Sequence, residues 1–334
     1  MSAARLHQPT GPVVIEQVAI PSPGPGEVLL RIEACGLCHS DLFIRSLDRL
    51  PRAPLTLGHE AIGVVEQAGS GVEQFGPGDR AGLTYLFSSC GQCEYCRSGR
   101  SQLCPEQLNT GYHVDGAFAE YAIGRADHLV KVPAELSAAQ AAPLCCAGWT
   151  AYHAVGAAGL PPGSWLAIFG VGGLGHLAVQ FARLAELRVA AVDVSAEKLS
   201  LAKQMGAEVV INAAQEDAAR AFKKLGGAHG AITFVASATV VRQAFRCLRR
   251  AGVLVLVGLA AETFELPLVE IVLKAIHLRG SFLGRQEELQ EIFELARRGD
   301  VRIETQSCSL ETLPEAMDQM QAGKLPGRTV VTFP

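Results

Sequence analysis

Four cysteines with short, regular spacing form the strongest chemical motif in this 334-residue sequence. The array is Cys-x2-Cys-x2-Cys-x7-Cys and consists of Cys90, Cys93, Cys96 and Cys104. Such spacing lets short turns bring four thiolates around one tetrahedral metal ion, for which zinc is the expected occupant. An iron–sulfur cluster or a set of redox-active thiols is the alternative. A site closed by four thiolates has no open coordination position, so segment 90–104 is predicted to bind a structural zinc ion.

Three other segments carry side chains that could bind a second metal ion. Cys38 lies in the run Gly-Leu-Cys-His-Ser-Asp-Leu, His59 in Gly-His-Glu, and Cys145 and Cys146 in Pro-Leu-Cys-Cys-Ala-Gly. Taken singly, a loop histidine or a buried thiol is common in proteins without metal. Together these segments make the chain resemble the zinc-containing medium-chain alcohol dehydrogenases, particularly the shorter bacterial and yeast-type enzymes, over essentially its whole length.

The resemblance implies that Cys38, His59 and Cys146 hold a catalytic zinc ion. Cys145 is the alternative third ligand, because adjacent side chains project in different directions and one of the two can point at a given metal. The family motif favours Cys146, which leaves Cys145 as a small apolar side chain. Two cysteines and one histidine leave the fourth position to water or substrate. Zinc in such a site stabilises an alkoxide or polarises an aldehyde or ketone.

The resemblance also assigns catalytic roles to Ser40, Asp41 and Glu60. Ser40 would take the proton of the alcohol, and Glu60 would lie beside the zinc. Asp41 would orient His59, as carboxylates behind ligand histidines do when they fix the tautomer of the ring.

One position departs from the family pattern. Many relatives continue the proton relay through a histidine where this sequence has Phe43. Phenylalanine cannot carry a proton, so after Ser40 and the cofactor ribose the proton must leave another way, through water or His39. We therefore expect slow alcohol oxidation near neutral pH.

A glycine-rich turn between an apolar strand and a helix predicts a dinucleotide site. The turn follows the apolar run 165–169 and contains Gly170, Gly172, Gly173, Leu174 and Gly175. Its glycines let a pyrophosphate approach the helix N-terminus, where free amides and the helix dipole favour negative charge. Asp193, at the end of the next strand, can accept hydrogen bonds from both adenosine ribose hydroxyls and repel a 2′-phosphate. NAD is therefore predicted rather than NADP.

The family resemblance adds residues around the cofactor and the substrate. Lys198 would support the ribose, although a solvated helix lysine is an equal alternative. The other expected cofactor contacts are His39 and Arg328 at the pyrophosphate and Thr150 near the nicotinamide. Relatives place pocket residues at the positions of Tyr85, Leu86, Phe87 and Trp149. Packing in a core is the alternative for these large side chains.

Patterns of apolar residues divide the chain into two kinds of domain. Alternation and glycine punctuation from 27 to about 68 indicate an irregular β domain. Later, helices separate apolar strands expected at 165–169, 189–192, 209–211, 232–235, 253–257 and 278–283. That order is typical of a parallel sheet covered on both faces. A helix at 287–298 and a closing strand at 329–333 would rejoin the first domain.

The predicted fold class is therefore α/β with a second, β-rich domain. The β-rich catalytic domain, GroES-like by resemblance, would comprise 1–148 and 286–334 and include the cysteine lobe 90–104. A Rossmann domain with a doubly wound parallel sheet would bind NAD over 149–285.

Composition excludes several classes of function. The chain is 49% apolar and 19% charged with a formal net charge of -4, and it has no Lys/Arg tract of the kind that binds nucleic acid or an anionic membrane. The N-terminal segment lacks the features of a signal peptide. We expect a cytoplasmic protein that acts on a small molecule, in which the ten cysteines serve as metal ligands or buried thiols. The resemblance implies a homo-oligomer, a tetramer.

The predicted function is a zinc-dependent oxidoreductase with two zinc ions per chain. It would transfer hydride between NAD and a primary or secondary alcohol, aldehyde or ketone. Polyol-type relatives usually lack the third cysteine ligand, and cinnamyl-type relatives usually have a small hydroxyl residue in place of Asp193. A zinc-free quinone reductase would leave the ligands unexplained. A non-catalytic NAD- or zinc-binding protein on the same scaffold is the alternative outside the enzymes.

Overall fold

The computed structural model describes residues 1–259, 261–325 and 327–334 and divides into two units. One unit comprises Met1–Trp149 and Arg285–Pro334, and the other comprises Thr150–Gly284. The domain boundaries predicted after residue 148 and before residue 286 each lie one residue from these limits.

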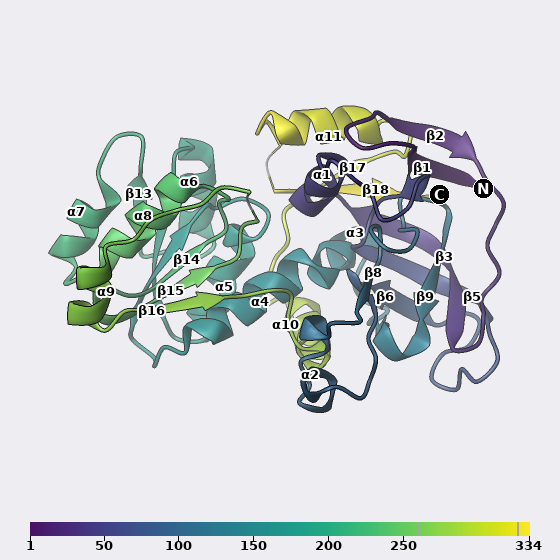
Figure 1. Ribbon diagram of the computed structural model, residues 1–334, viewed down its shortest axis with the longest axis horizontal. Helices are drawn as coiled ribbons and strands as arrows, with labels where there is room; N and C mark the ends of the chain where they lie inside the picture. Colours follow the sequence, from purple (N-terminus) through teal and green to yellow (C-terminus); the bar gives the residue numbers. More distant parts are fainter. Residues whose placement is uncertain (260, 326) are drawn as a thin grey trace. The chain divides into compact units, whose positions relative to one another are not determined.

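The first unit is built on a sheet of mostly antiparallel strands (Figure 1). The strand order is β10-β6-β5-β3-β18-β17, and β9 also pairs with β3. The strands are β3 (Glu27–Gly36), β5 (Ala61–Ala68), β6 (Arg80–Leu83), β9 (Tyr121–Arg125), β10 (Val130–Lys131), β17 (Thr305–Cys308) and β18 (Arg328–Thr332). Val28, Leu30 and Ile32 of β3 point into the hydrophobic core, as their alternation predicted.

Shorter elements complete the first unit. One small sheet contains β2 (Val13–Gln17), β1 (Ser2–Leu6) and β4 (Leu55–Thr56), and another contains β7 (Leu86–Ser88) and β8 (Leu108–Asn109). The α-helices are α1 (His39–Arg45), α2 (Glu94–Arg97), α3 (Ala138–Ala141), α10 (Gln286–Arg297) and α11 (Leu313–Gln321). Single 3-10 turns occupy Ser101–Leu103, Ala126–His128 and Ala142–Cys145.

The C-terminal segment returns to the first unit, as predicted. β18 pairs antiparallel with β3, and Val330 lies opposite Gly36. In α10 the residues Leu289, Ile292 and Phe293 are buried, because a spacing of three and four residues places them on one face of the helix. The N- and C-terminal parts of the chain therefore share one core.

The second unit contains a parallel sheet of six strands flanked by helices (Figure 1). The strand order is β13-β12-β11-β14-β15-β16, and every neighbouring pair is parallel. The strands are β11 (Trp165–Phe169), β12 (Arg188–Asp193), β13 (Val209–Asn212), β14 (Ala228–Thr233), β15 (Leu248–Leu256) and β16 (His277–Gly280). The helices are α4 (Ala147–Ala158), which begins in the first unit, α5 (Gly175–Leu184), α6 (Ala196–Gln204), α7 (Ala218–Lys224), α8 (Ala238–Cys247) and α9 (Leu268–Lys274).

Three strands differ from the prediction by three residues or more. β14 begins at Ala228 rather than at 232, β15 begins at Leu248 rather than at 253, and β16 ends at Gly280 rather than at 283. The start of β14 was predicted too late because its first half contains histidine and glycine and therefore lacks an apolar pattern. Pairing with β11 nevertheless makes this half a strand, since Gly230 lies opposite Leu166. A Cβ at Gly230 would lie 2.9 Å from Leu160 Cδ1, so close packing explains the glycine there.

None of the helices in the described part of the chain has the length and apolar character that a membrane crossing requires.

Candidate active site and metal centres

Cys38, His59, Glu60 and Cys146 form a buried cluster in the first unit. Their potential ligand atoms all lie within 4.8 Å of one another. Cys38 occupies the extended position before α1, with φ -118° and ψ 152°. His59 and Glu60 lie between β4 and β5, and Cys146 directly follows the 3-10 turn Ala142–Cys145. Three separate segments therefore supply one site.

The two neighbouring cysteines point in different directions. Cys146 Sγ belongs to the buried cluster, whereas Cys145 Sγ faces Ala61 O at 3.7 Å. A Cβ at Gly82 would lie 3.0 Å from Cys145 Sγ, so that thiol packs on the sheet between β5 and β6. Burial raises the pKa of the Cys145 thiol well above its usual value, which suits an uncharged packing group.

Asp41 fixes the orientation of His59 from behind. The Asp41 carboxylate accepts hydrogen bonds from Cys38 N at 2.9 Å and Gly58 N at 3.2 Å, and its Oδ1 lies 3.2 Å from His59 Nδ1. His59 Nε2 is buried and has no hydrogen-bond partner within the described residues. Because buried polar atoms are normally paired, an unpaired ring nitrogen facing two cysteines fits a metal ligand.

Charge in the cluster is arranged to favour a cation. A hydrogen bond from Cys146 and the nearby His59 ring lower the pKa of the Cys38 thiol, although burial opposes this shift. Burial alone would lower the pKa of His59, but the Asp41 carboxylate reverses that effect and raises it. The lowered pKa favours the thiolate form of Cys38, and zinc has a strong preference for thiolate sulfur.

Glu60 forms a buried ion pair with Arg328, and the sequence analysis missed this contact. Arg328 Nη2 donates a hydrogen bond to Glu60 Oε1. Burial raises the pKa of the Glu60 carboxyl to about 7, and Arg328 opposes that rise. The two residues are 268 positions apart, so no local spacing could have linked them. The pairing of β18 with β3 brings them together.

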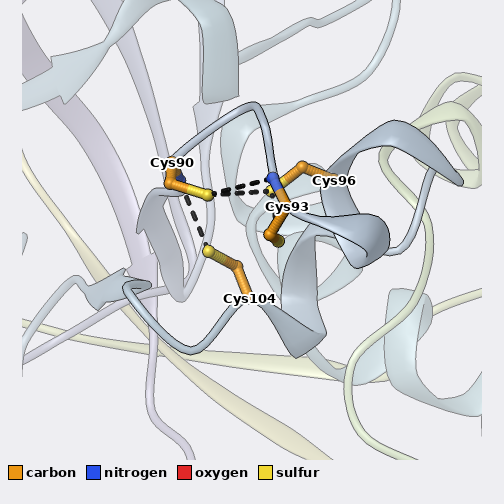
Figure 2. A group of neighbouring side chains, drawn as sticks. All are labelled: Cys90, Cys93, Cys96 and Cys104. Carbon is orange, nitrogen blue, oxygen red and sulfur yellow. Dashed lines mark hydrogen bonds between the residues drawn. The ribbon is translucent and has the colours of Figure 1, made fainter.

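The four-cysteine lobe also brings its sulfur atoms together (Figure 2). The potential ligand atoms lie within 4.8 Å of one another. Backbone amides point at the sulfurs: Cys90 N lies 3.4 Å from Cys104 Sγ, and Cys93 N lies 3.4 Å from Cys90 Sγ. Short α2 buries none of its residues, so the lobe has few apolar contacts of its own. A metal ion would have to organise it.

The glycine turn after β11 has the geometry of a phosphate-binding loop. Gly170 has φ +89°, and a Cβ at Gly175 would approach Gly170 O more closely than 3.0 Å. A Cβ at Gly172, in contrast, would meet nothing within 4 Å. Gly173 and Leu174 are half-buried and precede α5, whose first residue is Gly175. The turn is therefore packed on one side and open on the other, where a ligand could reach the amides.

Asp193 lies beside this turn at the end of β12. Its Oδ2 accepts a hydrogen bond from Val171 N at 2.8 Å, and its Oδ1 accepts from Val194 N at 2.8 Å and Ser195 N at 3.0 Å. These amides hold the carboxylate in one position next to the glycine motif. Each carboxylate oxygen has more than one lone pair, so Asp193 can still accept ribose hydroxyls.

Comparisons with known proteins agree with this geometry. The model of the alcohol dehydrogenase GroES-like domain matches residues 24–134, and the zinc-binding dehydrogenase model matches residues 173–298. An alcohol dehydrogenase of Geobacillus stearothermophilus is 43% identical, with 99% of each chain covered. The chain belongs to the zinc-containing medium-chain alcohol dehydrogenases.

Solved structures of similar proteins extend the comparison. The alcohol dehydrogenase of the hyperthermophilic archaeon Aeropyrum pernix has a TM-score of 0.93 at 35% identity over 100% of both chains. Acetophenone reductase from Geotrichum candidum in complex with NAD has a TM-score of 0.91 at 29% identity, covering 99% of this chain and 97% of the other. The predicted fold class and the class of zinc-dependent, NAD-linked oxidoreductase are confirmed by this family membership.

Within this alcohol dehydrogenase fold, α1 carries several of the predicted residues. Ser40 is half-buried, and its Oγ lies 3.6 Å from Cys38 Sγ, whereas His39 is exposed. Phe43 is 38% exposed and lines a surface cavity of about 360 Å³ together with Arg45. The cavity lies between α1 and residues of the N-terminal and C-terminal segments, namely Thr10 and Gln321.

The four predicted pocket residues have different surroundings. Tyr85 places its ring edge against His59, with 5.1 Å between ring centroids, and burial raises the pKa of its phenol well above the usual value. Leu86 and Phe87 are buried, as is Trp149, whose Nε1 donates a hydrogen bond to Arg285 O at 2.8 Å. Tyr85 is therefore the member of this set that the structure brings to the zinc-ligand cluster.

The remaining cofactor candidates lie on helices of the second unit. Lys198 is half-buried on α6, and its backbone N–H donates to Oγ of Ser195, the N-cap residue of the helix, at 3.3 Å. Thr150 is buried on α4 with 7% exposure.

Proposed function

We propose that this protein is an alcohol dehydrogenase in which Cys38, His59 and Cys146 hold the catalytic zinc. It transfers hydride between NAD and a primary or secondary alcohol, or the corresponding aldehyde or ketone. The observation that carries the proposal is the unpaired, buried Nε2 of His59 within 4.8 Å of the Cys38 and Cys146 sulfurs. Two thiolates and a neutral histidine balance the charge of zinc and leave one position open.

The residues around this site have separate roles. When bound, zinc supplies Lewis-acid polarisation of the substrate oxygen. Ser40 accepts the proton of the alcohol, while Asp41 holds His59 in the tautomer that presents Nε2. Glu60 lies beside the metal position, with its charge shared by Arg328. Tyr85 shapes the substrate side of the site, because its ring packs against the ligand histidine.

Asp193 selects NAD as the cofactor. Its carboxylate binds the adenosine ribose and would repel the 2′-phosphate of NADP. The turn of Gly170, Gly172, Gly173, Leu174 and Gly175 binds the pyrophosphate at the N-terminus of α5. By family resemblance, Lys198 supports the ribose, His39 and Arg328 contact the pyrophosphate, and Thr150 lies near the nicotinamide. The exposure of His39 supports its role, since a ligand can reach it.

The cysteine lobe binds the second, structural zinc ion through Cys90, Cys93, Cys96 and Cys104. Amide hydrogen bonds to the sulfurs support thiolates at these positions. All ten cysteines are free thiols, which suits a reducing compartment such as the cytoplasm.

The protein assembles with further copies of itself, as a tetramer if it follows its relatives. β16 is the edge strand of the parallel sheet, and its neighbour α9 exposes Leu268, Val269, Val272 and Leu273 by 66–73%. An edge strand beside an apolar patch offers both unpaired backbone groups and apolar surface to a second copy. Val272→Glu should reduce the mass measured by analytical ultracentrifugation.

A substrate panel with metal analysis tests the proposed activity. NAD reduction is measured with ethanol, longer alcohols, benzyl alcohol, cinnamyl alcohol and a polyol, with and without a chelator. We expect activity with simple alcohols that the chelator abolishes. Cys146→Ser should lose catalytic zinc and activity, whereas Cys145→Ser should keep both. Silence across the panel at full zinc and NAD occupancy would instead indicate a non-catalytic binding protein.

A further inference from the structure

Trp149 joins the two places at which the chain passes from one unit to the other. The first unit ends at Trp149 and resumes at Arg285, and the indole Nε1 of Trp149 donates a hydrogen bond to Arg285 O at 2.8 Å. The Trp149 side chain is buried, with 1% exposure. Its indole N–H is a donor only, so this contact satisfies the one polar group of the side chain. The indole therefore ties the first turn of α4 to the residue that precedes α10.

Cys146 lies three residues before this contact, between two helical elements. The 3-10 turn Ala142–Cys145 ends before it, and α4 begins after it at Ala147. The side of the turn is fixed in the sheet, since Cys145 Sγ packs against Ala61 O. The direction of the Cys146 side chain therefore also depends on what holds the start of α4.

Helix α10 supports the start of α4. A Cβ at Gly148 would lie 2.8 Å from Leu144 Cδ2 and 3.5 Å from Ile292 Cγ2 of α10, so the two helices pack closely here. Ile292 is fully buried. Apolar contacts are non-directional, whereas a hydrogen bond constrains the orientation of both its groups. The hydrogen bond from Trp149 therefore fixes the rotation of the first turn of α4 against α10.

The N-terminus of α10 is itself anchored in the first unit. Arg285 N donates to Glu288 Oε2 at 2.8 Å, and Gln286 Nε2 donates to Asp127 O at 2.9 Å. Asp127 belongs to the 3-10 turn Ala126–His128 that follows β9. The carbonyl that accepts from the indole is thus held by contacts on both sides of it.

Helix α4 continues from the first unit into the second. It begins directly after Cys146, and its residues beyond Trp149 belong to the second unit. Hydrogen bonds between successive turns make a helix stiff, so a rotation of its far part would reach Cys146 unless the first turn is held. Trp149 holds the helix at the last residue before it leaves the first unit.

We propose that Trp149 is a positioning residue that keeps Cys146 directed at the catalytic metal by fixing the first turn of α4 to Arg285. The inference rests on the proposed catalytic zinc site of Cys38, His59 and Cys146. In that cluster the ligand atoms lie within 4.8 Å of one another. Without the indole N–H, Cys146 turns away from the cluster more often, and zinc dissociates faster.

Zinc release from the full-length protein tests this role. A chromogenic chelator records release from both proposed sites, after metal analysis has shown that both are filled. The kinetic phase that is missing in Cys146→Ser belongs to the catalytic zinc. Trp149→Phe keeps an aromatic ring but removes the N–H. Trp165→Phe is the matched control, because it makes the same substitution at the other tryptophan of the chain, on β11 of the second unit.

We expect Trp149→Phe to accelerate the catalytic-zinc phase by up to about tenfold, the range that one hydrogen bond contributes, and to leave the phase of the cysteine lobe unchanged. Trp165→Phe should match the wild type in both phases. Gln286→Ala removes an anchor of α10 and should accelerate the catalytic-zinc phase by a smaller factor. After exchange of the catalytic zinc for cobalt, the sulfur-to-cobalt charge-transfer band should be weaker in Trp149→Phe than in the wild type.

Several outcomes would overturn the inference. An unchanged catalytic-zinc phase in Trp149→Phe would show that the indole N–H does not position the ligand. Equal acceleration of both phases would indicate a general loss of stability and would equally contradict it. If Trp149→Phe does not fold, Gln286→Ala decides, and wild-type release from that variant would refute the support by α10. A wild-type protein with no phase that depends on Cys146 would refute the catalytic zinc site itself, and this result is distinguishable because it precedes the comparison of the variants.

Discussion

Alanine substitutions at two glycines of the turn after β11 should impair different properties of the protein, namely its stability at one position and its cofactor binding at the other. A Cβ at Gly175 would come within 3.0 Å of Gly170 O, a backbone atom that cannot move without displacing the turn. A Cβ at Gly172 would meet no atom within 4 Å. Gly175→Ala therefore perturbs the packing of the fold, whereas Gly172→Ala fills space that we assign to the cofactor.

The contacts set the expected magnitudes. Forcing a methyl group into a packed site costs about 1–3 kcal/mol, and each kcal/mol lowers the midpoint of thermal unfolding by roughly 2–4 °C in a protein of moderate size. Gly175→Ala should therefore unfold at least about 2 °C below the wild type. Gly172→Ala should change stability by less than about 0.5 kcal/mol but weaken NADH binding about tenfold, which corresponds to about 1.4 kcal/mol.

Calorimetry and NADH fluorescence titration measure the two effects separately. Gly156→Ala is the matched control, because Gly156 is exposed on α4 of the same unit and its Cβ would meet nothing within 4 Å. Alanine there should stabilise the helix by up to about 1 kcal/mol and leave NADH binding unchanged. Wild-type NADH affinity in Gly172→Ala, or an unchanged unfolding midpoint in Gly175→Ala, would refute the reasoning.

Other substitutions test the active site and the second unit. Asp41→Asn should lower the affinity for catalytic zinc by about 10–100-fold in a chelator competition, because the amide cannot hold His59 as the carboxylate does; unchanged affinity would count against this role. Phe43→His should raise the rate of alcohol oxidation near neutral pH, and an unchanged pH–rate profile would argue against a missing relay. Asp217→Ala should destabilise the fold by about 1 kcal/mol, because Asp217 accepts a hydrogen bond from Ala219 N at 2.8 Å at the start of α7. Desolvation acts to raise the pKa of the Asp217 carboxyl, but the hydrogen bonds from the helix amides outweigh it and lower the pKa below the usual value of 3.8. The contribution of Asp217 to stability should therefore be present at neutral pH and disappear as the pH falls below about 4. Equal stability of Asp217→Ala and wild type in urea at pH 7 would contradict this.

Contacts within a short segment could be predicted well. The cysteine lobe and the glycine turn depend on local turns, so their spacing already indicated which side chains converge. The parallel sheet of the second unit was also readable, since its strands are apolar and separated by helices. β14 was placed too late, because Ala228 and Gly230 carry little apolar signal and pairing with β11 determines their conformation.

Contacts between distant segments could not be derived from spacing. Glu60 and Arg328 pair because β18 enters the sheet beside β3, and register between strands depends on the packing of the whole core. The hydrogen bonds that join Ser89 to His128 and His128 to Asp127 have the same origin, since the 3-10 turn after β9 packs near the end of β7. Neither leaves a pattern in the sequence.

The sequence by itself therefore determined which local motifs can supply chemistry: two sets of candidate metal ligands, a glycine-rich turn before a helix, and a carboxylate at the end of the next strand. Those motifs are local, because turns and helix ends depend on neighbouring residues. The tertiary structure decided which side chains share a site. Cys146 rather than Cys145 faces His59, and Arg328 rather than solvent faces Glu60, because burial and strand register fix the direction of each side chain.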